Sequence, residues 1–304
     1  MRTGSFVVAA VFVLAAPFVA NAQDVTPLVT AEWLKAHAGD DNVKILDIRD
    51  DIEGTDLGEL PYIADAVVAP YASAGWRVEV DGVPAQIPPS EQIAALIGAL
   101  GIDGDDHVVI VPWGTDSSEF GGATRVYWTF KYLGHNPVSI LDGGWRQYDA
   151  AGGARASEPS TPVAAEFPVQ LRPELRATTA DVEAALASGI KLVDGRPEEQ
   201  FLGQSKSPVV RTEGTIPGAV NLPHSKFYSG EYASFAQPET IAALEQSVGL
   251  GADEKNVVFC NTGHWASIAW FALHEVGEGI QEAEQEAGQH HRHRLPVGED
   301  QGGE

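Results

Sequence analysis

The sequence that decides the fold occurs twice, as VKILDIR at residues 43–49 and as IKLVDGR at residues 190–196. Both stretches are apolar runs that end in an aspartate and an arginine, which is typical of a buried strand that emerges at a polar edge. A second matching pair follows, IADAVVAP at residues 63–70 and IPGAVNLP at residues 216–223. The chain therefore contains an internal repeat with an offset of roughly 150 residues.

Each half then continues with a helical pattern, a short apolar run and a second helical pattern. Continuous apolar runs that alternate with helices are typical of parallel strands covered on both faces, so we expect an α/β fold with two doubly wound domains. Each domain would have a central parallel sheet flanked by helices. Aligned by their apolar residues, the two runs place Val111 opposite Cys260, and the loop after Val111, Pro112 to Gly122, is several residues longer. The segments, first half before second, are Ile93–Leu96 and Ile241–Leu244, His107–Val111 and Asn256–Cys260, and Ala123–Leu133 and Ala266–Val276.

The first 22 residues have the pattern of a secretory signal peptide. Arg2 gives a positive start, residues 6–19 are almost wholly apolar, and Ala20-Asn21-Ala22 fits a cleavage site. We therefore expect residues 1–22 to be removed, with the mature chain periplasmic or secreted. After cleavage we expect no membrane association.

The remaining chain divides by composition and repeat. We expect a first domain at residues 23–150, a surface linker rich in Ala, Pro, Ser and Glu at 151–176, and a second domain at 177–277. The first half has a further strand and a Gly-Gly-Trp turn, residues 135–145, after its last repeated helix. Residues 278–304 are rich in Glu, Gln, Gly and His and have no strand pattern. We expect a disordered tail there, with the last strand of the second domain missing.

Net charge limits the partners. The chain of 304 residues has a formal net charge of −24, so we expect it to bind neither nucleic acid nor an anionic membrane. An anionic substrate would need a locally positive pocket. The single cysteine cannot form an internal disulfide, so in an exported protein it is either a buried core residue or a working thiol.

That cysteine, Cys260, lies in the stretch VVFCNTGHWAS, residues 257–267. We expect it at the carboxyl end of a buried strand, where open α/β sheets bind their ligands. Backbone N–H groups of the following loop and the dipole of the next helix both favour a thiolate. We expect Gly263 to allow the tight turn and Ser267 to cap the helix.

The repeat, the string TIPGAVNLP at residues 215–223, the cysteine loop and LDGGW at residues 141–145 together resemble the tandem rhodanese family of sulfurtransferases. The resemblance covers residues 27–277 and implies two rhodanese-like domains, of which only the second is catalytic. It implies that Cys260 takes a sulfane sulfur from a small sulfur-containing anion, thiosulfate or 3-mercaptopyruvate, as a persulfide, and passes it to cyanide or a thiol. It implies no metal or organic cofactor. The active-site loop would be Asn261, Thr262, Gly263, His264, Trp265 and Ala266.

The sequence departs from the family in the loop and beside it. The Arg and Lys that follow the cysteine in thiosulfate-preferring relatives are absent, as is the Gly-Ser-Gly-Val of mercaptopyruvate-preferring ones. His264 either carries positive charge or is a neutral hydrogen-bonding group. Gln200 stands where relatives commonly have a substrate-binding arginine. Arg196 either binds substrate or forms a salt bridge with Asp194. Trp265 either forms a cleft wall or packs at the helix start.

Two other classes are excluded. A cysteine-dependent phosphatase needs an arginine six residues after the cysteine, where this chain has Ala266. A thioredoxin-like oxidoreductase needs a second cysteine. The remaining rival to an enzyme is a non-turnover persulfide carrier or sulfur-binding protein with the same fold.

Overall fold

The computed structural model describes residues 25–51, 61–229, 234–251 and 254–277. The expected signal peptide, 1–22, and the expected tail, 278–304, lie outside the described residues. No helix in the described ranges is long and apolar enough to cross a bilayer.

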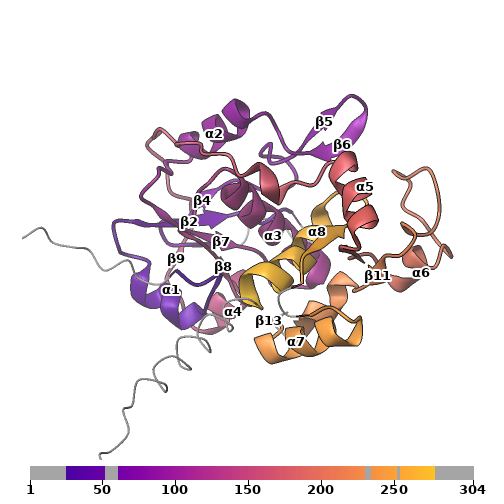
Figure 1. The fold of residues 1–304 in the computed structure, drawn as a ribbon. Helices are drawn as coiled ribbons and strands as arrows, with labels where there is room; N and C mark the ends of the chain where they lie inside the picture. Colours follow the sequence, from indigo (N-terminus) through magenta and orange to yellow (C-terminus); the bar gives the residue numbers. More distant parts are fainter. Residues whose placement is uncertain (1–24, 52–60, 230–233, 252–253, 278–304) are drawn as a thin grey trace, which may run out of the picture.

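The first half is built on a parallel sheet with the strand order β1-β8-β7-β2-β4 (Figure 1). All five residues of its central strand β7 are buried. Side chains alternate across this strand: Val108 and Ile110 pack into one hydrophobic cluster, and Val109 and Val111 into another. Helices therefore cover both faces of the sheet, as expected for a doubly wound domain. The strands are β1 (Leu28–Val29), β2 (Val43–Asp47), β4 (Val67–Val68), β7 (His107–Val111) and β8 (Val138–Leu141), and the helices are α1 (Ala31–His37), α2 (Ser90–Ala99), α3 (Ser117–Tyr132) and α4 (Gly144–Ala150).

The second half has a parallel sheet of three described strands in the order β11-β10-β14. These strands correspond to β4, β2 and β7 of the first half. All four residues of β14 are only half-buried, which corrects the expectation of a fully buried strand. In the described part of the chain no strand pairs with the outer edge of β14, whereas β8 pairs with β7. The elements are α5 (Thr179–Ser188), β10 (Lys191–Asp194), α6 (Glu198–Phe201), β11 (Val220–Asn221), η3 (His224–Phe227), β12 (Tyr228–Ser229), β13 (Ser234–Phe235), α7 (Pro238–Ser247), β14 (Asn256–Phe259), α8 (His264–Trp270) and the π-helical η4 (Phe271–Val276).

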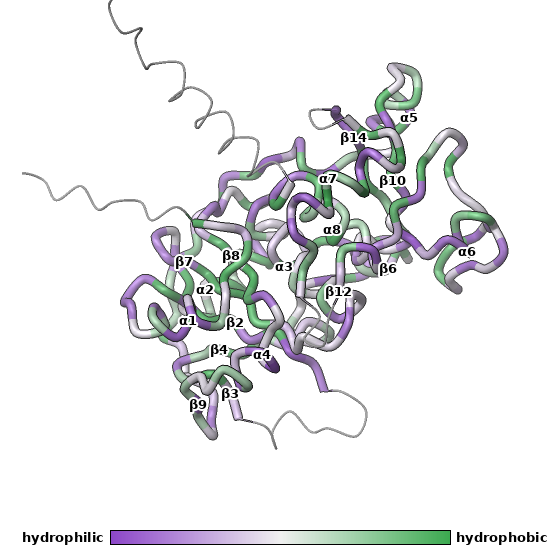
Figure 2. Tube along the Cα trace, turned by 90° about the horizontal axis from the view of Figure 1, so that it is seen from below, coloured by the Kyte–Doolittle hydropathy of each residue, from purple (hydrophilic) through white to green (hydrophobic). Residues whose placement is uncertain are grey.

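Helices α3 and α8 pack against each other where the two halves meet, and they lie next to one another in Figure 2. Equivalent residues of the repeat face each other there: Thr124 Oγ1 lies 2.8 Å from Ser267 Oγ, and both side chains are buried. One hydrophobic cluster runs from the first half into the second through Phe120, Phe235 and Phe271. The two halves therefore share a core, and the equivalent helices α3 and α8 form the contact between them.

Residues 151–176 run along the first half, largely exposed. Strand β9 (Arg155–Ala156) pairs with β3 (Tyr62–Ile63). The N–H of Ala165 then donates to the carbonyl of Gly98, and that of Gln170 to Leu133. The segment ends in the short 3-10 helix η2 (Pro173–Leu175). A two-stranded hairpin, β5 (Val78–Val80) and β6 (Val83–Gln86), completes the first half.

The strand register corrects the predicted alignment by one residue. The N–H of Ile48 donates to the carbonyl of Val111, and the equivalent N–H of Gly195 donates to that of Phe259. Pro112, and not Val111, therefore stands opposite Cys260. Matching the starts of two apolar runs of unequal length caused the error. The predicted long loop from Pro112 to Gly122 is also wrong. Helix α3 already begins at Ser117, so most of the extra residues of the first half lengthen this helix and not the loop.

The predicted helix cap at Ser267 is also wrong. Helix α8 begins at His264 with Gly263 as its N-cap, and no side chain caps it. Ser267 lies inside the first turn, where its hydroxyl donates to the carbonyl of His264 at 2.7 Å.

Candidate active site

Cys260 directly follows β14, at the carboxyl end of the strand that pairs with β10. Its side chain is partly exposed, and its thiol is free. The backbone N–H of Gly263 points at Cys260 Sγ, at an N-to-S distance of 3.1 Å. The loop is therefore short enough to fold back on the sulfur.

Gly263 makes this turn possible. Its φ of +78° lies in the left-handed region, which glycine adopts without a steric penalty. A Cβ atom at this position would collide with Nη1 of Arg125, which comes from helix α3 of the first half. The glycine thus allows both the turn and the close approach of an arginine.

Asn261 is held by two side chains of the second half. Its Nδ2 donates to Gln200 Oε1 at 2.9 Å, and its Oδ1 accepts from Arg196 Nη1 at 3.4 Å. Gln200 stands where the resemblance led us to expect an arginine, and here it holds the cysteine loop by accepting a hydrogen bond from Asn261.

Arg196 forms the salt bridge considered from the sequence. Its Nη2 donates to Asp194 Oδ2 at 2.5 Å, and the Asp194 side chain is fully buried. The first half contains the same pair, with Arg49 Nη2 at 2.6 Å from Asp47 Oδ2. Because the same pair occurs in both halves, it is a feature of the repeated strand end and is not specific to the half that contains Cys260. Binding of substrate by Arg196 stays a prediction.

His264 sits between the two halves as a neutral hydrogen-bonding group. Its Nε2 lies 2.6 Å from the carbonyl of Ser118, which can only accept, so Nε2 carries the hydrogen. Its Nδ1 therefore accepts a hydrogen bond from the Tyr71 hydroxyl, at an oxygen-to-nitrogen distance of 3.0 Å. Burial lowers the pKa of His264 to about 4. Of the two interpretations of this residue, the geometry therefore favours the neutral one.

Trp265 packs at the start of α8. Its ring stacks on His224 with centroids 4.6 Å apart, and its Nε1 donates to Ser118 Oγ at 3.2 Å. Thr262, Gly263 and Ala266 line a cavity. The predicted loop residues therefore form contacts within the second half, contacts between the two halves and one wall of a cavity.

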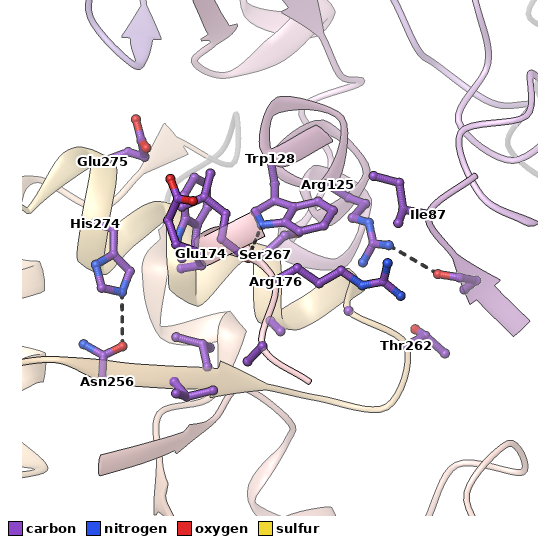
Figure 3. A pocket seen from close by; sticks show the side chains of 18 of the residues that line it. Ile87, Arg125, Trp128, Glu174, Arg176, Asn256, Thr262, Ser267, His274 and Glu275 are labelled. Atoms are coloured by element: carbon purple, nitrogen blue, oxygen red, sulfur yellow. Dashed lines mark hydrogen bonds between the residues drawn. The ribbon is translucent and has the colours of Figure 1, made fainter. Parts of the chain in front are cut away.

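This cavity has a volume of about 530 Å³. It lies between the outer edge of β14, helix α3, linker residues 174–177 and the cysteine loop (Figure 3). Strand β14 runs along one side of it, from Asn256 toward Thr262. A space of this size can hold a small organic molecule.

Two site residues from the first half were not predicted from the sequence. Arg125 on α3 is 8% exposed, and Tyr71 is 7% exposed. Burial lowers the pKa of Arg125, and its interaction with the ionised forms of Tyr71 and Cys260 opposes that shift. Burial raises the pKa of Tyr71 to about 12, so it remains a neutral phenol. A lone arginine in the mostly apolar stretch 120–130 was the available signal for Arg125.

The equivalent loop of the first half has a different occupant. The N–H groups of Trp113 and Gly114 donate to the carboxyl oxygens of Glu119, at 2.7 and 3.1 Å. Glu119 is half-buried, and the loss of solvation around its carboxyl group raises its pKa to about 7. The N–H groups of this loop are thus used within the domain.

Comparison with known proteins agrees with this architecture. Residues 30–151 and 178–285 each match the Rhodanese-like domain family. A relative from Haloferax volcanii, named as a proposed thiosulfate sulfurtransferase, is 30% identical over 264 residues, which cover 82% of this chain and 87% of the relative. A Mycobacterium bovis protein of the same kind is 29% identical over 258 residues, covering 82% of this chain and 88% of that protein.

Solved structures share the fold. The 3-mercaptopyruvate sulfotransferase SseA from Escherichia coli superposes with a TM-score of 0.67 at 23% identity, covering 82% of this chain and 93% of that one. The wild-type structure of EanB gives a TM-score of 0.70 at 21% identity, covering 83% and 63%. With the family matched in both halves, the chain belongs to the rhodanese family, and it is a sulfurtransferase.

Proposed function

We propose that this sulfurtransferase takes the sulfane sulfur of thiosulfate, or of a related donor such as 3-mercaptopyruvate, onto Cys260 as a persulfide and delivers it to cyanide or a thiol. The observation that carries the proposal is the free thiol of the half-buried Cys260 at the carboxyl end of β14, facing the N–H of Gly263. The names of the relatives support the choice of thiosulfate.

With thiosulfate as donor, the Cys260 thiolate attacks the outer sulfur. The bond between the outer sulfur and the sulfite sulfur breaks, and sulfite leaves with the electron pair. The enzyme then holds a Cys260–S–S⁻ persulfide, to which the loop N–H donates. Cyanide attacks the terminal sulfur, the S–S bond breaks, thiocyanate leaves and the thiolate is restored.

Steady-state kinetics test this scheme. Thiocyanate release measured at several thiosulfate and cyanide concentrations should give the parallel double-reciprocal lines of a ping-pong mechanism. Replacing thiosulfate with 3-mercaptopyruvate in the same assay identifies the preferred donor. Intersecting lines would mean that both substrates bind together and would contradict a free persulfide enzyme.

The second candidate is a persulfide carrier without turnover. Gln200 favours it, because the residue binds Asn261 and offers no positive charge to a donor. A carrier would take up sulfur from thiosulfate once, and cyanide would not discharge it.

We also propose that the protein is exported to the periplasm or the medium, on the basis of the signal-like pattern of residues 1–22. A mature N-terminus at Gln23, read by mass spectrometry of the protein from its native host, would support export. A chain retained in the cell with an intact N-terminus would contradict it.

A further inference from the structure

Arg125 is a buried cation without a carboxylate partner in the residues that the structure covers. Its Nη2 donates to the carbonyl of Ala85 at 3.3 Å, and its Nε is buried with no hydrogen-bond partner among the described residues. Its guanidinium carbon lies 4.9 Å from the ring centroid of Trp128. Buried charges are costly unless an opposite charge compensates them, so a bound anion would stabilise this arginine.

The guanidinium lies where that anion would be useful. It contacts Gly263 of the cysteine loop and lines the cavity along β14. Arg176 of the linker lines the same cavity and is close enough to interact electrostatically with Arg125. In Figure 3 both guanidinium groups lie at the end of the cavity nearest Thr262.

The carboxylates of the cavity do not neutralise this end. Glu174 and Glu275 lie toward the opposite end in Figure 3. Glu275 accepts a hydrogen bond from the Tyr127 hydroxyl at 2.6 Å and pairs with Lys131 at 3.2 Å. The cavity therefore has a cationic end beside the cysteine loop, in a chain whose net charge of −24 repels anions elsewhere.

We propose that Arg125, assisted by Arg176, binds the oxyanion group, carboxylate or sulfur oxyanion, of the small molecule that reacts at Cys260. The inference rests on the proposed function and specifies its substrate class. The half without the cysteine supplies the anion recognition that the second half lacks at Gln200. Arginine suits this role because its planar fork can donate two hydrogen bonds to one oxyanion.

Alkylation of Cys260 by two reagents of similar size tests the proposal in the full-length protein. Iodoacetate is anionic and iodoacetamide is neutral, and in both reactions the thiolate displaces iodide and forms an S–C bond. Because both reagents attack the same thiolate, its abundance cancels in the ratio of the two rates. The ratio therefore reports anion recruitment alone.

Arg125→Gln should lower the iodoacetate-to-iodoacetamide rate ratio about tenfold, because a charge-assisted interaction is lost. Arg125→Lys and Arg176→Gln should lower it about two- to threefold, since a point charge or the buried arginine remains. Arg155→Gln removes the same charge at an exposed site beside Asp149 and should leave the ratio unchanged.

An unchanged ratio in Arg125→Gln, including one in which both rates fall equally, would overturn the proposal. If that variant fails to fold, unchanged ratios in both Arg125→Lys and Arg176→Gln would overturn it instead. A lowered ratio without any persulfide formation would keep the anion site and reject the sulfur transfer. In steady state, the donor whose KM rises in Arg125→Gln, thiosulfate or 3-mercaptopyruvate, identifies the oxyanion.

Discussion

The loops after β7 and β14 occupy the same place in the two halves and use their backbone differently. In the first half Pro112 takes the position of Cys260, and Glu119 fills the loop with its own carboxyl group. In the second half the loop N–H faces the free thiol of a half-buried cysteine. One strand–loop–helix unit thus offers N–H groups to an acceptor in both halves, and only the second leaves that acceptor open to chemistry.

The strands that precede the two loops, β7 and β14, also differ in how far they are buried. Strand β7 lies between β2 and β8 and is buried throughout, while β14 is half-buried and borders a cavity. The first half therefore acts as a packed support. Two of its residues also reach across the interface, where Arg125 approaches Gly263 and Tyr71 contacts His264.

The largest effect should come from replacing the sulfur itself. Cys260→Ser should lower sulfur transfer by roughly 10³-fold or more, because a serine hydroxyl at neutral pH cannot replace a thiolate nucleophile. The thermal unfolding midpoint should stay close to that of the wild type, since the loop backbone is unchanged. Retained turnover would mean that sulfur is carried elsewhere and that the contrast between the loops is wrong.

A smaller effect should come from His264, whose equivalent in the first half is Gly121. A Cβ atom on Gly121 would lie 2.6 Å from His264 Nε2, so the missing side chain makes room for the imidazole. Burial lowers the pKa of His264 from 6.5 to about 4. As the pH falls, His264 is therefore protonated in the unfolded chain before it is protonated in the folded protein. The stability that the neutral imidazole contributes is fully present above pH 6.5 and is lost as the pH falls toward 4.

Comparison with His264→Gln isolates this contribution. Between pH 7 and pH 4 the wild type should lose roughly 2–3 kcal/mol of unfolding free energy relative to the variant, measured by urea denaturation. Parallel pH profiles for the two proteins would show that the imidazole is solvated in the folded state.

The smallest effect should be the difference in stability loss within a matched pair of strand substitutions. Val109 and Val257 are equivalent by register, but Val109 is fully buried and Val257 is half-buried. Val109→Ala should cost about 2–3 kcal/mol of stability and Val257→Ala about 1 kcal/mol. Equal losses would indicate that the edge of β14 is as well covered as β7.

Local sequence patterns predicted the strands, the repeat and the place of Cys260 at a strand end. They could do so because VKILDIR and IKLVDGR carry both the strand signal and the polar edge within seven residues. The one-residue register error at Pro112 arose because hydrophobicity alone does not mark where an apolar run pairs with its neighbour.

The contacts between the halves could not be predicted in this way. Arg125 lies 135 positions before Cys260 in the chain, and only the packing of α3 on α8 brings it to the cysteine loop. For the same reason the sequence could not decide between the two interpretations of His264. Its hydrogen-bond partners, Tyr71 and Ser118, both belong to the first half.

Peptide mapping after sulfur loading tests the central claim most directly. The protein is incubated with thiosulfate, freed of excess reagent, digested without reductant and analysed by mass spectrometry, before and after cyanide. We predict a gain of about 32 Da confined to the peptide that contains Cys260, and its loss on cyanide treatment. An unchanged mass of this peptide with both thiosulfate and 3-mercaptopyruvate would contradict the account.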